Sequence, residues 1–245
     1  MSTNYNAIAE EYKSSKLLPW RLHVESYTYL KKLGDLSGLK ILDLACGEGF
    51  YSRIFKLKGA SKVVGVDLSD EMIRLAKEAE GHNPVGIEYH AHNVLSLELN
   101  EKFDLVCASY LLNYAKSPEE LNQMVKVISK HLKPNGRFVT VNSNPDYKGS
   151  VDTMLQYGFT RENIGNEEGS EIIYRFYQPN GTHISVTNYH HEKSTHETVL
   201  KEAELSNIQW HPIEVSPEIK EGNSDVDWTD ILTNQPVICM SCSKV

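Results

Sequence analysis

Residues 42–55 read LDLACGEGFYSRIF, and this stretch decides the fold. It begins as an apolar run of the kind that a buried strand shows, passes through Gly47 and Gly49, and continues as a helix. Small residues in a strand-to-helix turn let the backbone approach a ligand at the N-terminus of the helix. The stretch therefore predicts a strand, a binding loop and a helix in direct succession.

An acidic residue follows at the distance that an adenosine-type cofactor requires. Asp67 stands twenty residues after Gly47, at the end of the next apolar run, where a carboxylate can accept hydrogen bonds from both ribose hydroxyls. The NAD fingerprint G-x-G-x-x-G wants a third glycine where this chain has Ser52. Glu48 puts negative charge where a pyrophosphate would sit, which a cationic sulfonium tolerates, and Asp43 adds an acid suited to an amino group. The charges therefore favour S-adenosylmethionine over NAD.

Strand-like and helix-like patterns alternate from about residue 38 to 142. Such alternation is typical of a parallel sheet with helices on both faces. Ser69 and Ser117 are placed to cap two of the helices, and two further apolar runs near the C-terminus can close the sheet. We expect an α/β, Rossmann-like, doubly wound and mainly parallel seven-stranded sheet. Its expected strands are 39–46, 62–69, 86–94, 102–110, 136–144, 208–215 and 236–243.

The whole chain, 1–245, is predicted to be a single domain. Residues 146–170 are polar, and we expect them to be irregular. The strand-like runs 171–178 and 182–190 flank Pro179-Asn180-Gly181, which predicts a β-hairpin. We expect this insertion to be a lid on the substrate side. The predicted parts are an N-terminal helical cover (1–37), a cofactor-binding core (38–142), the lid insertion (145–192), and a closing helix and strands (193–245).

The composition argues against nucleic acids and membranes as partners. The 245 residues hold 25 Lys and Arg against 33 Asp and Glu, a net charge of −8, whereas phosphate binding needs clustered positive charge. No apolar run approaches the about 18 residues of a transmembrane helix, and the polar start has no targeting signal. We expect a cytoplasmic protein with a small-molecule acceptor, while the oligomeric state stays open. The histidines show no metal-ligand spacing, and Cys239 and Cys242, although they form a C-x-x-C, are expected to be small buried hydrophobes, so we expect no metal.

The order ILDLACGEG, GVDLSDEM, FDLVCASYLLNY, LKPNGRFV resembles the class I S-adenosylmethionine-dependent methyltransferases. The resemblance covers about residues 38–142. Within that family, NYNAIAEEYKSSKLLPWRLHVESY before DLACGEGFYSR is similar to the toxoflavin-synthase-like small-molecule methyltransferases. One departure is Ala45, which replaces the usual first loop glycine, and we expect its φ angle to be negative.

The resemblance implies a cofactor site at the ends of the first four strands. It implies that Asp67 holds the ribose, that Asn93 accepts a hydrogen bond from the adenine amino group, and that Val94 offers its N–H to the ring. The methionine part of the cofactor is lined by Asp43, Ala45, Cys46 and Gly47. Leu68 and Met72 pack against the adenine, and Ser109 and Tyr110 lie where cofactor and substrate meet.

The substrate side is predicted from the N-terminal segment and the hairpin. Tyr12 is expected to cover the cofactor as a cofactor-binding and catalytic residue, and Arg21 to pair with the cofactor carboxylate. The alternative for Tyr12 is a residue that packs on the domain, and the alternative for Arg21 is a solvated surface arginine. His190 and His191 end the second hairpin strand and are the candidate general bases by position. The candidate substrate-binding residues are Tyr110, Asn113, Tyr174 and Tyr189.

The sequence thus predicts methyl transfer from S-adenosylmethionine to a small heteroaromatic metabolite, with N-methylation of a natural-product type favoured. The alternatives are an NAD-dependent oxidoreductase, which Ser52 and Glu48 disfavour, and a non-catalytic cofactor-binding module. Nucleic-acid methylation is a further option that the net charge opposes.

Overall fold

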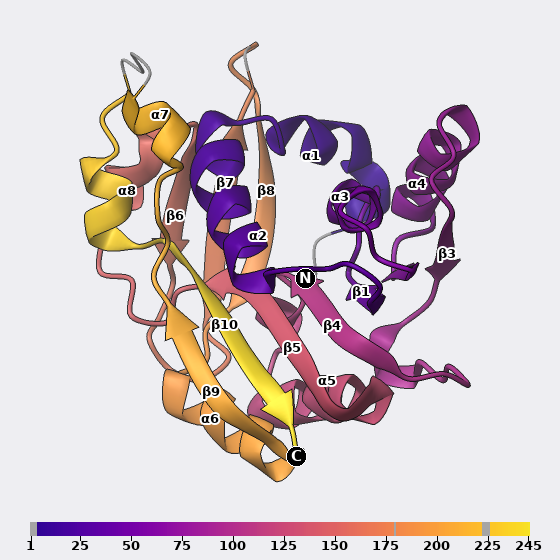
Figure 1. Cartoon of the computed structure of the whole chain (residues 1–245). Coiled ribbons are helices and arrows are strands. Elements are labelled where there is room, and N and C mark those ends of the chain that lie inside the picture. The colour runs from indigo at the N-terminus through magenta and orange to yellow at the C-terminus, as the bar shows by residue number, and fades with distance from the viewer. Residues whose placement is uncertain (1–3, 179, 222–225) are drawn as a thin grey trace.

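The computed structural model describes residues 4–178, 180–221 and 226–245, and a seven-stranded sheet lies at its centre (Figure 1). The strands are β1 (Lys40–Leu44), β2 (Lys62–Asp67), β3 (Ile87–Ala91), β4 (Phe103–Ser109), β5 (Leu132–Ser143), β9 (Leu205–His211) and β10 (Val237–Lys244). Their order is β3-β2-β1-β4-β5-β10-β9. The first five are parallel, and β10 runs antiparallel to both β5 and β9. The expected doubly wound, mainly parallel sheet is confirmed.

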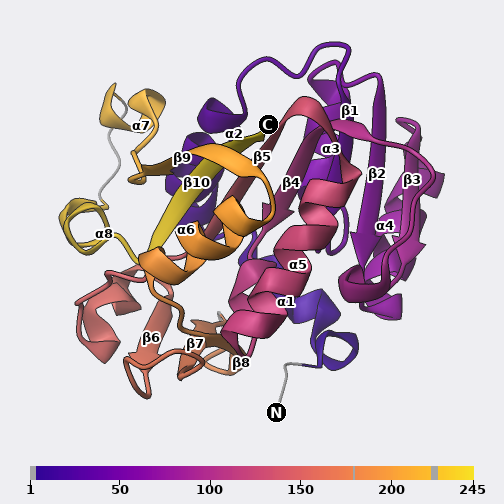
Figure 2. The same ribbon diagram turned by 90° about the horizontal axis from the view of Figure 1, so that it is seen from below.

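Helices cover both faces of this sheet. The core on one face includes α2 (Tyr27–Leu33), α3 (Phe50–Leu57) and α4 (Asp70–His82). The other face carries α5 (Pro118–His131) and α6 (Lys193–Glu202), which lie side by side in Figure 2. Successive strand residues point to opposite faces, so Ile41 joins the first core and Leu42 the second. The runs that read as continuously apolar are therefore strands buried on both faces.

The N-terminal segment folds as a series of short helices. These are η1 (Tyr5–Ala7), α1 (Ala9–Ser15) and the π-helical η2 (Arg21–Ser26), which runs directly into α2. Trp20 and Arg21 are almost completely buried at the start of η2. A π-helical segment is rare and is often found at functional sites. The remaining short helices are η3 (Val94–Ser96), η4 (Leu112–Tyr114), η5 (Val151–Tyr157), α7 (Pro217–Glu221) and α8 (Thr229–Asn234).

The insertion after β5 forms a second sheet, with β7 (Glu171–Tyr177) at its centre between β6 (Phe159–Asn163) and β8 (His183–Tyr189). All pairings are antiparallel, and the predicted hairpin is β7–β8; Pro179 of its turn lies outside the described residues. This sheet lies near α1, because the ring of Tyr12 on α1 lies 6.3 Å from that of Phe176 on β7.

The expectation that residues 146–170 are irregular was wrong, because they contain η5 and β6. Although the sequence is polar, it contains a strand that is largely buried, β6. Arg161 is 1% exposed, and its guanidinium donates hydrogen bonds to the carbonyl oxygens of Pro236 (2.7 Å) and Asn144 (3.0 Å). Its burial is satisfied by backbone partners that are distant in sequence, which no local pattern predicts.

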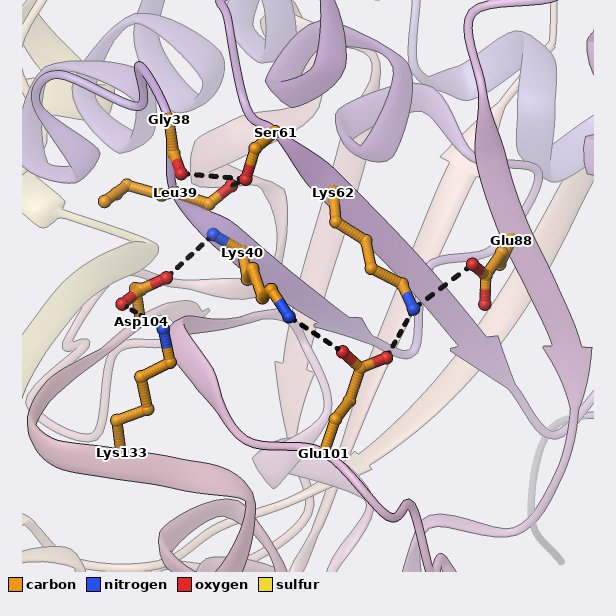
Figure 3. A network of polar contacts seen from close by, with 9 residues as sticks. All are labelled: Gly38, Leu39, Lys40, Ser61, Lys62, Glu88, Glu101, Asp104 and Lys133. Carbon is orange, nitrogen blue, oxygen red and sulfur yellow. Dashed lines mark hydrogen bonds and ion pairs between the residues drawn. The ribbon is translucent and has the colours of Figure 1, made fainter.

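Charged side chains gather near the start of β1 and β2 (Figure 3). Lys62 bridges Glu101 (2.5 Å) and Glu88 (3.2 Å), and the Lys40 ammonium lies 3.5 Å from Glu101. Lys133 forms a separate pair with Asp104 at 2.7 Å. Partly exposed pairs of this kind contribute roughly 0–1 kcal/mol each. These charges are paired with one another at the amino ends of the strands, and the site lies at the opposite ends.

We expect Gly49→Ala to destabilise the fold and Gly81→Ala to stabilise it. Gly49 has a φ angle of +84°, and an added Cβ would lie 2.8 Å from Cζ of the Tyr89 ring. Gly81 lies inside α4 with open space around its Cα. Left-handed backbone costs an L residue about 1–2 kcal/mol, whereas alanine gains up to about 1 kcal/mol over glycine in a helix. Urea unfolding of both variants measures the two changes, and equal signs would contradict the prediction.

Candidate active site

The loop after β1 adopts left-handed backbone at three positions. The φ angles are 56° at Ala45, 57° at Gly47 and 84° at Gly49. The expectation of a negative φ at Ala45 was therefore wrong, and an L residue holds a conformation that favours glycine. Hydrogen bonds hold the loop in place, among them the one from the Cys46 N–H to the carbonyl oxygen of Val66 (3.1 Å). The loop is thus fixed before any ligand arrives.

Asp67 fastens this loop to the end of β2. Its Oδ2 accepts a hydrogen bond from the Gly47 N–H (2.8 Å), and its Oδ1 accepts one from the Ser69 N–H (2.9 Å). Burial raises the pKa of the Asp67 carboxyl, and the two backbone N–H groups act against this rise. Each carboxylate oxygen retains acceptor capacity for a hydroxyl.

A cavity of about 290 Å³ opens at the carboxyl ends of the parallel strands. It is the larger of two adjoining cavities and is called the cofactor cavity below. Leu68 is 71% exposed at its rim, as an apolar side chain that a flat ligand would cover. The predicted residues that line it are Tyr12, Ala45, Gly47, Asp67, Leu68, Met72, Asn93, Val94, Ser109 and Tyr110. Lining residues that the sequence analysis did not assign include Tyr5, Lys16, Leu95, Leu111, Tyr114, Lys116, Glu120 and Met124.

Acidic groups lie directly behind the loop. Asp43 is 1% exposed; its Oδ2 accepts a hydrogen bond from Ser52 Oγ at 2.5 Å, and its Oδ1 has no hydrogen-bond partner among the described residues. Burial raises the pKa of Asp43 to about 7. Glu48 also has a buried oxygen, Oε2, without a partner in the described chain. Asp43 and Cys46, both predicted to line the site, do not line the cofactor cavity. When ionised, the buried acids Asp43 and Glu48 next to the loop favour a cation in this cavity.

Lys16 is one of two basic residues, with Lys116, that line the cofactor cavity. Its ammonium lies 5.5 Å and 5.4 Å from the ring centres of Tyr12 and Tyr51. It follows Tyr12 by four residues, the spacing that puts two helical side chains on one face. That spacing was the available signal for Lys16, which can pair with a carboxylate.

Arg21 occupies a different place from the one predicted. It does not line the cofactor cavity but the smaller adjoining one, and it is 2% exposed. Its guanidinium lies 4.9 Å from the ring centre of Phe176 and 5.3 Å from that of Tyr12. Its Nε is 3.8 Å from Glu25, and neither Nε nor Nη1 has a hydrogen-bond partner among the described residues.

Three tyrosines separate the two cavities. Tyr12, Tyr110 and Tyr114 line both of them, and we call them the tyrosine partition. The Tyr110 hydroxyl donates a hydrogen bond to the fully buried Glu25, and the Tyr114 hydroxyl contacts that of Tyr5. Tyr12 therefore lies between the cofactor loop and the inserted sheet, where a residue that covers the cofactor is expected. Its role as a cover stays a prediction.

The structure does not bring several predicted residues to this place. His191 Nδ1 pairs with Glu168 (2.5 Å) and its Nε2 with the carbonyl oxygen of Ala115 (2.9 Å), so both ring nitrogens are occupied. His190 lines a separate polar hollow beside Asp146. Neither histidine lines the two cavities, because the residues that end β8 turn toward the start of α6.

Two of the four predicted substrate residues are also displaced. Asn113 Oδ1 accepts a hydrogen bond from the backbone N–H of Ser143 (3.2 Å), which ties η4 to β5. Tyr189 follows Asn188 on β8 and so points to the opposite face of the inserted sheet. Both residues line neither cavity, whereas Tyr110 and Tyr174 line the smaller one.

Comparisons with known proteins agree with this geometry. Residues 41–136 match the family described as "Methyltransferase domain", and residues 90–208 match the one described as "25S rRNA (adenine(2142)-N(1))-methyltransferase, Bmt2". Residues 41–136 are thus similar to a methyltransferase domain, and the chain has the fold of solved S-adenosylmethionine-dependent methyltransferases. The solved structure of S-adenosylmethionine-bound CalS10, an amino pentose methyltransferase from Micromonospora echinaspora, shares the fold with a TM-score of 0.60 and 17% identity over 97% of both chains.

Curated relatives match part of the chain. A demethylmenaquinone methyltransferase from Lactococcus lactis subsp. lactis (strain IL1403) is 32% identical over 62% of this chain and 63% of its own. A ubiquinone biosynthesis O-methyltransferase from Coxiella burnetii (strain Dugway 5J108-111) is 25% identical over 76% of this chain and 73% of its own. The chain thus spans less than two thirds of the first relative.

The site fits S-adenosylmethionine, which solved structures of the same fold bind. The orphaned oxygens of Asp43 and Glu48 suit its ammonium and sulfonium charges, and Lys16 suits its carboxylate. Ser109 Oγ is a further buried group without a partner in the described residues. Within those residues, no group of three or more His, Cys, Asp or Glu is placed to hold a metal ion. No helix in the described part of the chain is long and apolar enough to cross a membrane.

We expect Asp67→Asn to weaken cofactor binding strongly. The amide keeps one acceptor oxygen, but an NH2 group replaces the other. This NH2 group then faces N–H or O–H donors that the carboxylate now satisfies. Losing charge-assisted hydrogen bonds to ribose and to the loop corresponds to roughly 2–4 kcal/mol, or about 30- to 1,000-fold in affinity. Calorimetry with S-adenosylhomocysteine measures the effect. Asp70→Asn, on the exposed first turn of α4, is the control, and equal affinities for both variants would contradict the assignment.

Asp43 should make stability fall as the pH rises. With its pKa raised from 3.8 to about 7 in the folded state, Asp43 keeps its proton there while the unfolded chain releases it. This contribution is complete below about pH 4 and is lost by about pH 7. Urea unfolding between pH 4 and 8 should therefore show a steeper decline for the wild type than for Asp43→Asn. Parallel curves would show that Asp43 does not titrate in this range.

Proposed function

We propose that the protein transfers the methyl group of S-adenosylmethionine to a nitrogen atom of a small, planar heteroaromatic metabolite. The observation that carries this proposal is the tyrosine partition, which forms a boundary between the cofactor cavity and a smaller cavity under the inserted sheet. An acceptor held at the partition lies next to the cofactor and away from bulk water. Aromatic walls suit a flat acceptor.

The residues of the chain contribute mainly position. When bound, S-adenosylmethionine supplies an activated methyl group on a sulfonium, so in-line alignment and exclusion of water provide much of the rate. Asp67 and the Gly47 loop hold one end of the site, and Tyr12 closes it from above, with its ring 5.0 Å from that of Tyr5 and 6.3 Å from that of Phe176.

The absence of histidine from both cavity linings in the described residues supports nitrogen as the methylated atom. A heteroaromatic nitrogen with an available lone pair needs no general base, whereas a phenolic hydroxyl must lose its proton. The Coxiella relative is named an O-methyltransferase, which favours oxygen instead, and O-methylation of a planar hydroxyl compound is the second candidate.

A small acceptor is also favoured over nucleic acid. One of the matching families is named for an rRNA methyltransferase. The chain nevertheless has a net charge of −8, which opposes binding of a polyanion.

Turnover tests the proposal. The protein would be incubated with S-adenosylmethionine and a panel of pteridine-, pyrimidine- and indole-like acceptors, followed by mass spectrometry for S-adenosylhomocysteine and methylated product. Product with the methyl group on nitrogen, located by NMR, is expected. A protein that binds the cofactor but forms no S-adenosylhomocysteine with any acceptor would be a cofactor-binding module, and methylated RNA with no small product would support the rRNA-type alternative.

We expect Tyr12→Phe to lower kcat by less than tenfold and Tyr12→Ala to lower it by 100-fold or more. The ring excludes water and orients the acceptor, effects worth several powers of ten together, whereas the hydroxyl accounts for a part. Tyr27→Ala, on a ring that lines neither cavity, is the matched control and should leave kcat unchanged. Melting temperatures confirm that the variants fold. Equal rates for wild type and Tyr12→Ala would make Tyr12 a packing residue.

A further inference from the structure

The smaller cavity gathers polar groups that have no partner. Its volume is about 20 Å³, which exceeds the roughly 10–15 Å³ that one water molecule needs but cannot hold a ring. It shares the tyrosine partition with the cofactor cavity. Its other lining residues are Trp20, Arg21, Tyr174, Phe176, Val186 and Asn188. The volume therefore suits one edge of a ligand whose ring lies at the partition.

Asn188 is the acceptor group of this cavity. It lies on β8 and is 2% exposed, and its Oδ1 has no hydrogen-bond partner among the described residues. Val186, two residues earlier on the same face of the strand, lines the cavity with it. A buried amide oxygen without a donor opposes folding, so such a group in a cavity wall indicates a ligand that supplies the donor.

Donor groups lie in the same wall. The Trp20 Nε1–H and the Nε and Nη1 groups of Arg21 are buried without hydrogen-bond partners in the described chain. Glu25 does not supply the missing hydrogen bonds, because its carboxylate lies 3.8 Å from Arg21 Nε. The Glu25 carboxylate accepts hydrogen bonds from the hydroxyls of Tyr51 (2.9 Å) and Tyr110 instead. The wall thus offers one acceptor beside several donors.

We propose that Asn188 determines which acceptor is methylated, by binding the edge of a planar oxo heterocycle that carries an N–H beside a carbonyl. The N–H donates to Asn188 Oδ1, and the carbonyl accepts from the donors of Trp20 and Arg21. The ring lies at the tyrosine partition, which puts its far edge toward the cofactor cavity. This inference rests on the proposed function and narrows its substrate class to lactam-type heterocycles, since a hydrocarbon ring or a quinone offers no N–H.

Two probes that differ in the N–H test the inference. Lumazine has N–H groups beside carbonyls, and 1,3-dimethyllumazine has the same ring with those nitrogens methylated. Calorimetry with the full chain would first measure S-adenosylhomocysteine binding and then the binding of each probe to that complex. The variants are Asn188→Leu, which removes the polar group at similar volume, and Ser185→Ala, on the exposed face of the same strand, as the control.

The wild type and Ser185→Ala should bind lumazine at least tenfold more tightly than its dimethyl form, and Asn188→Leu should bind the two within twofold. S-adenosylhomocysteine affinity should stay within twofold in all three proteins. The melting temperature of ligand-free Asn188→Leu should equal or exceed that of the wild type, which a structural asparagine would not allow.

Equal binding of the two probes by the wild type, no binding of lumazine, or discrimination that survives in Asn188→Leu would overturn the inference. So would a loss of S-adenosylhomocysteine affinity in Asn188→Leu, because the smaller cavity would then hold part of the cofactor. Failure of the proposed function is visible separately, because the turnover assay would then yield no S-adenosylhomocysteine with any acceptor, whichever probe the protein binds.

Discussion

The hydrogen bond from the Gly47 N–H to Asp67 is the interaction on which the site depends. It joins the loop after β1 to the end of β2, two neighbouring parallel strands, at 2.8 Å. The left-handed backbone at Ala45 would be unfavourable in a free loop, and this bond, with the one from the Ser69 N–H, holds the loop. The carboxylate that fixes the loop also faces the cavity, so the shape and the charge of the site have a common origin.

The other half of the site comes from segments outside the parallel sheet. Glu25 in η2 is fully buried and holds Tyr51 of α3 and Tyr110 at the end of β4 through their hydroxyls. One carboxylate thus connects the N-terminal cover, the loop helix and the tyrosine partition. Arg21 lies near it at 3.8 Å and balances its charge without satisfying its own N–H groups. The cover is therefore part of the core and not a separate flap.

The sequence predicted what is encoded locally. The seven strands follow from apolar runs along the chain, and the glycine loop and Asp67 follow from the spacing within residues 42–67. The structure has all of them. The strand β6 and the place of Arg21 were missed because each depends on partners far along the chain, such as Pro236 for Arg161 and Phe176 for Arg21. His190 and His191 looked catalytic because they end a hairpin strand, but the turn into α6 carries them away from the cavities.

The substrate side was harder to predict from local sequence patterns because it contains buried polar groups that have no hydrogen-bond partner in the described chain. A chain selected only for stability would pair or replace buried groups such as Asp43 Oδ1, Asn188 Oδ1 and Arg21 Nε. Arg21 and Asn188 line the smaller cavity, and Asp43 lies on β1, two residues before Ala45 of the cofactor cavity. Each opposes folding of the free chain, and the proposed ligand would supply partners to Arg21 and Asn188. Ligands that bind the folded state then add stability in proportion to the logarithm of their concentration, so these defects couple folding to occupancy of the site.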